Sequence, residues 1–164
     1  MGKINRVEEM PVYQKFYELT LEVEGITRDY GSDFRWLRIQ LLKFSESVCA
    51  NMTEGFYAQY STEYLQSLFY CRREARETMT LIRYANDVNL LQKSVSESIC
   101  LRYNDALRQL ANLIKSIERK IHLKGKSKTT VYGVREGSES YEINPLQPPI
   151  IKHQAFKKKE NLKC

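Results

Sequence analysis

The sequence predicts an all-α protein, an up-down-up-down four-helix bundle followed by a C-terminal extension. Between Pro11 and His122 the chain has no proline and few glycines, and its apolar residues recur every three or four positions. Short polar turns divide this stretch into four amphipathic segments, which bury their stripes most simply by packing as a bundle. The chain has 164 residues, 42% of them hydrophobic and 28% charged, as expected for one globular domain.

The first helix is expected over residues 11–30, since Pro11 favours a helix start and Gly31 follows the last apolar position. Its apolar stripe is Val12, Phe16, Leu19, Val23, Ile26 and Tyr30. The second helix is expected over residues 33–57, because Gly55 and a polar turn interrupt the pattern there. Its stripe is Phe34, Leu37, Leu41, Phe44, Val48 and Met52.

The third helix is expected over residues 61–87, since Ser61 is a favourable N-cap and Glu63 lies in the first turn. Its stripe is Leu65, Leu68, Ala75, Met79 and Ile82. The fourth helix is expected to start near Ser94 and to end near His122. Its stripe is Val95, Ile99, Ala106, Leu110, Leu113, Ile117 and Ile121.

The predicted organisation is an N-terminal arm over residues 1–10, the bundle over 11–124 and an extension over 125–164. Apolar residues alternate with polar ones over 129–143, which predicts a small β-hairpin. Prolines and a run of lysines follow, which indicate an irregular basic tail.

The basic surplus lies mostly at the C-terminal end. The formal net charge is +6, and residues up to His122 contribute only +1 of it. A basic chain of this kind permits a polyanionic partner without requiring one. We expect a cytoplasmic protein without a membrane segment, because the sequence lacks a long apolar run and a signal peptide.

The residues that usually carry catalysis are sparse. The two histidines, His122 and His153, have no partner at metal-ligand spacing, and the cysteines form no Cys-x-x-Cys pair. The cysteines on or beside apolar stripes are expected to be reduced thiols that pack as small hydrophobes. We therefore expect no enzymatic activity, no metal and no cofactor.

The third helix places Arg72, Arg76 and Arg83 within about 40° of one another, beside Leu65 and Phe69. Such a mixture suits a surface that meets a neighbouring subunit or a nucleic acid. Equally, the arginine stems could cover the edge of the bundle while their guanidinium groups pair with nearby glutamates.

The fourth helix carries a basic line on the side opposite its apolar stripe. The line consists of Arg108, Lys115, Arg119 and His122, and it leads into Lys124, Lys126 and Lys128. These residues could contact the phosphates of a nucleic acid, or they could only keep the surface soluble.

The second helix has an outward apolar feature formed by Trp36, Ile39 and Ala50. An isolated bundle needs no exposed tryptophan, so self-association is one hypothesis, and a tryptophan folded over its neighbours is the other. Near the end of this helix, Asn51 and Glu54 lack a nucleophile or a metal beside them. A hydrogen-bonding role at the helix junction suits them better than acid–base chemistry.

Four segments carry a resemblance to a known family. The main one is residues 47–56 (SVCANMTEGF), followed by 61–65 (STEYL), and 12–15 (VYQK) and 74–78 (EARET) support it. They resemble a bacterial family of small four-helix-bundle proteins encoded in intervening sequences of large-subunit ribosomal RNA genes. The accessory variability proteins of diversity-generating retroelements are related to this family. The likeness extends over about residues 11–121.

The resemblance implies a homopentamer with a basic surface and no enzymatic activity, which binds structured nucleic acid or a reverse transcriptase. It also implies that Asn51, Glu54 and Gly55 serve packing or the turn between the second and third helices. The chain has Cys49 where many members have proline, and only Lys43 where a basic pair is common.

Two functions are thus expected from the sequence. The first is a non-enzymatic, oligomeric accessory protein that binds RNA or DNA, most plausibly RNA, through the basic residues of the third and fourth helices and the lysines that follow. The second is a protein-interaction scaffold whose basic faces and tail bind a partner protein.

Overall fold

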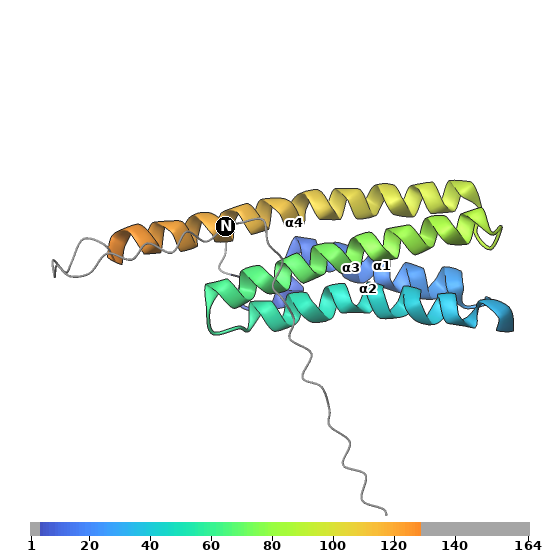
Figure 1. Ribbon diagram of the computed structural model, residues 1–164, viewed down its shortest axis with the longest axis horizontal. Coiled ribbons are helices and arrows are strands. Elements are labelled where there is room, and N and C mark those ends of the chain that lie inside the picture. Colours follow the sequence, from blue (N-terminus) through green and yellow to red (C-terminus); the bar gives the residue numbers. More distant parts are fainter. Residues whose placement is uncertain (1–3, 129–164) are drawn as a thin grey trace, which may run out of the picture. The chain divides into compact units, whose positions relative to one another are not determined.

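The structure, a computed structural model, describes residues 4–128, which form an all-α bundle (Figure 1). Its helices are α1 (Pro11–Thr27), α2 (Arg35–Phe56), α3 (Ser61–Asp87) and α4 (Lys93–Lys128). Two short 3-10 helices, η1 (Val7–Glu9) and η2 (Ser32–Phe34), precede α1 and α2. The predicted all-α class and four-helix bundle are confirmed. The predicted hairpin and basic tail lie outside the described residues.

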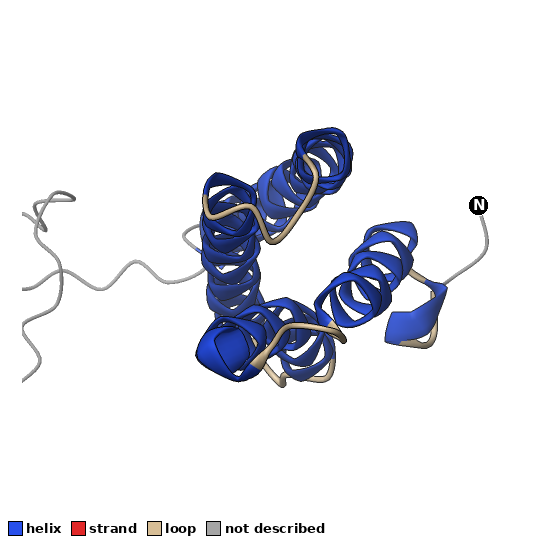
Figure 2. Ribbon diagram, turned by 90° about the vertical axis from the view of Figure 1, so that its right-hand side faces the viewer, coloured by secondary structure: helices blue, strands red, loops and turns tan. Residues whose placement is uncertain are grey.

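Neighbouring helices pack antiparallel, and α4 also packs against α1 (Figure 2). Cross-helix hydrogen bonds fix this order. Thr20 Oγ1 on α1 donates to the Ser45 carbonyl on α2 at 3.0 Å, and Cys71 Sγ on α3 donates to the Val48 carbonyl at 3.2 Å. The up-down-up-down topology follows, and it places the start of α1 at the same end of the bundle as the end of α4.

Most residues of the predicted apolar stripes lie in the core. On α1, Val12, Phe16, Leu19 and Val23 are buried, and Ile26 packs half-buried beside them. The residues before α1 join this core as well, because Val7 and Met10 are buried, so part of the predicted N-terminal arm is anchored to the bundle.

Three helix boundaries differ from the predictions. The first helix ends at Thr27 rather than residue 30, because the backbone N–H groups of Arg28 and Tyr30 bond three residues back, to the carbonyls of Gly25 at 3.4 Å and Thr27 at 3.2 Å, and the chain turns there. The second helix starts two residues late, after η2. The fourth extends through Lys128, so residues 125–128 belong to α4 and not to the extension.

The turn between α3 and α4 is built on Asn89, which has a φ of 61°. Asparagine tolerates this left-handed conformation better than most residues. The backbone N–H of Leu90 closes the turn on the Ala85 carbonyl at 2.8 Å, and Asn86 Nδ2 donates to the Leu91 carbonyl at 3.0 Å. The turn sets the register in which α4 packs on α3.

Candidate nucleic-acid interface

Helix α3 presents its predicted arginines to solvent. Arg72, Arg76 and Arg83 are all exposed, on the face that borders α4. Leu65 and Phe69 lie half-buried on the same face and pack against the core. The Arg72 guanidinium lies over the Phe69 ring, 5.0 Å from its centre, so this arginine covers an aromatic side chain.

Helix α4 presents Arg108, Lys115, Arg119 and His122 to solvent on one outward face. Its register against α3 follows from two contacts: Ser96 Oγ donates to the Ile82 carbonyl, and Cys100 Sγ lies 4.0 Å from the Met79 carbonyl. In this antiparallel register, Arg119 of α4 lies at the same height along the bundle as the first residues of α3.

The structure brings the two basic faces together at a shallow groove between α3 and α4. Arg76 borders it from α3 and Arg108 from α4, and the space between them is about 470 Å³. Leu101, Asn104, Leu107 and Ala111 complete its lining. Leu101 is 68% exposed. Leu101 was not predicted from the sequence as a site residue, although it lies seven residues before Arg108 on the same face of α4.

Most of these cations have no acidic partner. Within residues 4–128, no carboxylate lies within 4 Å of the side-chain nitrogens of five of them. These five are Arg72, Arg76, Arg83, Lys115 and Arg119. Arg108 differs, because it pairs with Asp105 at 3.1 Å. The predicted alternative, pairing of the α3 arginines with glutamates, is therefore not observed for these three, whereas Arg73 does pair with Glu74 at 2.9 Å.

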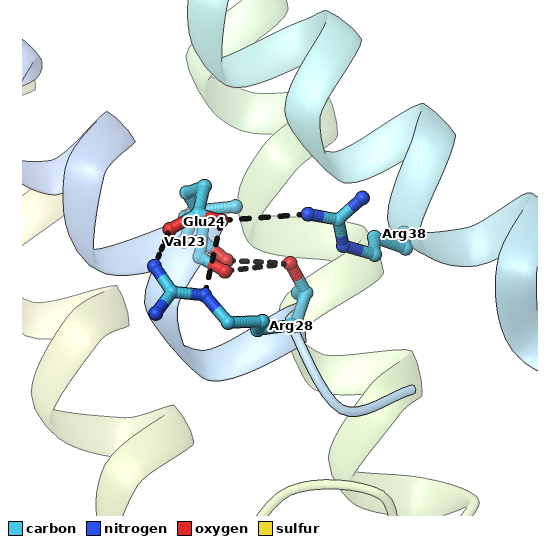
Figure 3. Close-up of polar contacts among 5 residues, drawn as sticks. Val23, Glu24, Arg28 and Arg38 are labelled. Carbon is cyan, nitrogen blue, oxygen red and sulfur yellow. Dashed lines mark hydrogen bonds and ion pairs between the residues drawn. The ribbon is translucent and has the colours of Figure 1, made fainter. Parts of the chain in front are cut away.

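Acidic residues predominate in the first part of the described chain. Residues 4–34 contain seven acidic and three basic residues, while α4 contains nine basic and three acidic residues. The α1 carboxylates are also engaged. Glu24 accepts from Arg28 at 2.6 Å and from Arg38 of α2 at 3.4 Å (Figure 3), and the hydrogen bond from Arg28 lowers the Glu24 pKa. Unpaired positive charge therefore concentrates on the α3–α4 face.

Comparison with known proteins identifies the family. Residues 8–112 match the sequence profile of the 23S rRNA-intervening sequence proteins. The chain belongs to this family. The resemblance drawn from residues 47–56 and the neighbouring segments is thereby confirmed.

A solved structure shows the same fold. It is described as a protein with unknown function from the S23 ribosomal protein family of Bacteroides thetaiotaomicron. The similarity has a TM-score of 0.59 and 21% sequence identity, and it covers 63% of this chain and 95% of the other. The curated proteins give no match. The family match ends at residue 112, so Lys115 and Arg119 of this 23S rRNA-intervening sequence protein lie beyond it.

The family motif lies where α2 meets α3. Gly55 is buried, and a Cβ atom there would lie 2.6 Å from the Ser67 Cβ atom of α3. Asn51 Nδ2 donates to the Ser47 carbonyl of its own helix at 2.7 Å. Glu54 is exposed and borders a groove of about 430 Å³ with Glu63 and four other residues. The three motif residues thus lie at the helix junction, each with a different environment.

The four predicted oligomer-contact residues lie in two places. Trp36 packs on Tyr84, with ring centres 5.8 Å apart, yet it stays 48% exposed beside Ile39, which is 53% exposed. Leu65 and Phe69 lie near the other end of α3, and Phe69 is about 22 Å from Tyr84 along the helix axis. The pair Trp36 and Ile39 and the pair Leu65 and Phe69 are therefore too far apart to lie in one contact surface of ordinary size.

Three thiols in the described part of this family member are buried. Cys49, Cys71 and Cys100 are free and buried, and burial raises the pKa of Cys49 to about 11 and that of Cys71 to about 12. A protonated, inaccessible thiol is a poor nucleophile. Among residues 4–128, no group of three His, Cys, Asp or Glu side chains could hold a metal ion, and no helix is long and apolar enough to cross a membrane.

Proposed function

We propose that the protein is a non-enzymatic RNA-binding protein and that its α3–α4 face binds the phosphates of the RNA. One observation supports this most directly: five exposed cations on this face have no carboxylate within 4 Å in the described part of the chain. The family description, which refers to 23S rRNA, favours RNA over DNA.

The arrangement of the cations suits a polyanion better than a protein surface of mixed charge. Arginine can contact a phosphate with two parallel N–H donors, and lysine adds a point charge. A surface cation paired with a carboxylate would first have to lose that partner, whereas an unpaired one exchanges only water and counterions. Release of those counterions makes the binding free energy strongly salt-dependent.

A matched pair of variants tests this proposal. Lys115→Glu/Arg119→Glu reverses two unpaired cations on the α4 face, and Arg35→Glu/Lys43→Glu makes the same change in net charge on α2, where both residues are exposed. We expect the first variant to weaken binding to a labelled RNA by at least tenfold, and the second to change it by less than threefold. Fluorescence anisotropy over a range of salt concentrations measures both, and circular dichroism checks that the helices persist.

The salt dependence adds a second criterion. Each lost phosphate contact should lower the slope of log K against log salt by about 0.7–0.9. Equal affinity losses in the two variants would mean that net charge matters and the face does not. Unchanged affinity in the α4 variant would overturn the assignment of phosphate contacts to α4.

The groove between Arg76 and Arg108 favours a second candidate function, a scaffold that binds an acidic partner protein. Its apolar residues, Leu101 and Leu107, lie between two guanidinium groups, which suits an acidic amphipathic segment. A reverse transcriptase is one such partner, because the resemblance to the accessory proteins of diversity-generating retroelements implies it. Binding through apolar anchors would respond only weakly to salt, which separates it from phosphate binding.

We also propose that this RNA-binding protein self-associates. Two observations support it: Trp36 and Ile39 remain about half exposed at one end of α2, and the family resemblance implies a pentamer. A ring of several copies would repeat the α3–α4 face around its axis and multiply the phosphate contacts available to one RNA molecule.

A further inference from the structure

Three tyrosines are exposed where α2 meets α3. Tyr57 follows the last residue of α2 and is 60% exposed, and Tyr60 precedes α3 and is 58% exposed. Tyr70, in the third turn of α3, is 38% exposed. Solvated tyrosine rings at such a junction contribute little to the core, so the fold alone gives no reason for them.

The two junction tyrosines are held on a short, well-defined turn. The Tyr57 backbone N–H donates to the Thr53 carbonyl at 3.2 Å, and its ring packs edge-on against Phe56, with centres 5.1 Å apart. The Tyr60 backbone N–H donates to the Glu63 carboxylate at 3.4 Å, and its carbonyl accepts from the Tyr64 N–H at 3.1 Å. Binding to these rings therefore requires little ordering of the backbone.

The unpaired cations of α4 reach the same height along the bundle as this turn. The antiparallel register of α3 and α4 places Arg119 level with Tyr60, and the basic half of α4 runs past this end of the bundle (Figure 1). Aromatic rings at the same end of a domain as a row of cations can bind an unpaired nucleic-acid strand, because bases stack on the rings while phosphates contact the cations.

A groove on the other side of the turn carries hydrogen-bond acceptors. Glu54 and Glu63 border it together with Gln66 and Tyr70, and Ala58 of the turn completes its near end. Carboxylates repel phosphates but accept hydrogen bonds from the amino groups of bases. The charges thus favour one orientation of a bound strand, with its phosphates towards α4 and its bases towards the turn and this groove.

We propose that this end of the bundle binds unpaired RNA nucleotides, whose bases stack on Tyr57 and Tyr60. The proposal rests on the RNA-binding function proposed above and narrows its substrate to single-stranded segments, loops or bulges. A regular duplex would contact the cations of the α3–α4 face but could not offer its stacked bases to the tyrosines.

The test compares two RNAs and three variants of the full chain. The probes are a fluorescent oligouridine, which is unpaired, and an RNA duplex of the same length, both at one fixed salt concentration. Tyr57→Ala/Tyr60→Ala removes the rings, Tyr57→Phe/Tyr60→Phe keeps them without the hydroxyls, and Lys115→Glu/Arg119→Glu reverses the cations. Circular dichroism confirms the fold of each variant.

We expect the alanine variant to lose roughly tenfold in affinity for oligouridine and less than twofold for the duplex, because stacking contributes substantially per base. The phenylalanine variant should bind both RNAs like the unchanged protein. Equal losses on both RNAs, or none on oligouridine, would overturn this inference. If the cation variant also leaves both affinities unchanged, the proposed function fails as well; if it lowers both, only the inference about unpaired nucleotides fails.

Discussion

Gly55 illustrates how one missing side chain shapes the bundle. A Cβ atom at this position would lie 2.6 Å from the Ser67 Cβ atom and 2.9 Å from the Tyr64 ring, both on α3. Contacts below 3 Å force neighbouring atoms to move, and here one of them is the first side-chain atom of Ser67. The absence of a side chain therefore lets α2 and α3 approach each other just before the turn that carries the exposed tyrosines.

Gly55→Ala should destabilise the protein by about 1–3 kcal/mol, the usual range for overpacking a well-packed contact. Gly25→Ala is the matched control, because Gly25 lies within α1 and a methyl group there would meet no atom within 4 Å. Alanine there should stabilise the helix by up to about 1 kcal/mol. Urea unfolding followed by circular dichroism measures both changes, and a destabilisation of similar size at the two sites would contradict the packing argument.

Single residues also mark the limit of what the sequence predicts. The heptad-like spacing identifies buried residues such as Phe16 and Leu110, because apolar side chains at helical spacing have few other uses. Tyr103 is fully buried and packs on Phe16 with ring centres 6.1 Å apart, yet a tyrosine in a helix is equally compatible with a surface position. Glu74 is buried and pairs with the neighbouring Arg73, and helical spacing does not reveal such a pair.

At the scale of helices, α1 and α4 are joined by polar ties as well as by apolar packing. Lys15 Nζ lies 2.5 Å from Asp105 Oδ2, and Arg102 of α4 pairs with Glu22 of α1. The hydrogen bond from Lys15 lowers the pKa of Asp105. A carboxyl group with a lowered pKa in the folded state stabilises the protein above its ordinary pKa, and this contribution is lost as the pH falls through the lowered value.

Asp105→Asn should therefore lower the urea midpoint at pH 7, and the difference from the unchanged protein should shrink steadily at pH values below about 3.9. Asp87→Asn serves as the control, because Asp87 is exposed and no cation lies within 4 Å of it among residues 4–128. It should change the midpoint little at either pH. A difference for Asp105→Asn that is equally large at pH 7 and at about pH 2.5 would contradict the ion-pair explanation.

Helix types and order were predictable because each helix is long and strongly periodic, whereas the boundaries depend on local contacts. Asn89 can adopt a left-handed conformation and end α3, but many asparagines do not. The end of α4 was predicted too early because the prediction relied on the apolar stripe, which stops at Ile121. A helix can continue beyond its apolar stripe, as α4 does to Lys128.

At the scale of the whole molecule, we expect more than one copy in solution. Light scattering coupled to size-exclusion chromatography should give a mass several times the 19.3 kDa of the chain, near five copies if the implied pentamer forms. Trp36→Glu/Ile39→Glu should reduce this mass, because it places charge in the half-exposed apolar patch of α2. Leu21→Glu on α1, where Leu21 is 57% exposed, is the control and should leave the mass unchanged.

A mass of one chain for the unchanged protein would overturn this expectation. Equal effects of the two variants would instead show that self-association does not depend on the α2 patch.

The candidate site was only partly predictable from the sequence. Helical spacing placed Arg72, Arg76 and Arg83 on one face and Arg108, Lys115 and Arg119 on another, and both sets are exposed. That the two faces meet at a groove depends on the register of α3 against α4, which the turn around Asn89 sets. The sequence does not reveal that Tyr57 and Tyr60 are exposed either, because tyrosines beside a turn often fold onto the core.

The difference in charge between α1 and α4 has a consequence for motion in solution. Acidic residues on α1 and basic residues on α4 give the folded domain an electric dipole that points towards α4. In the field of a polyanion the tumbling protein spends more of its time with that side in front, so collisions through the α3–α4 face outnumber those through α1. The molecule thus approaches such a target already turned towards it, before any specific contact has formed.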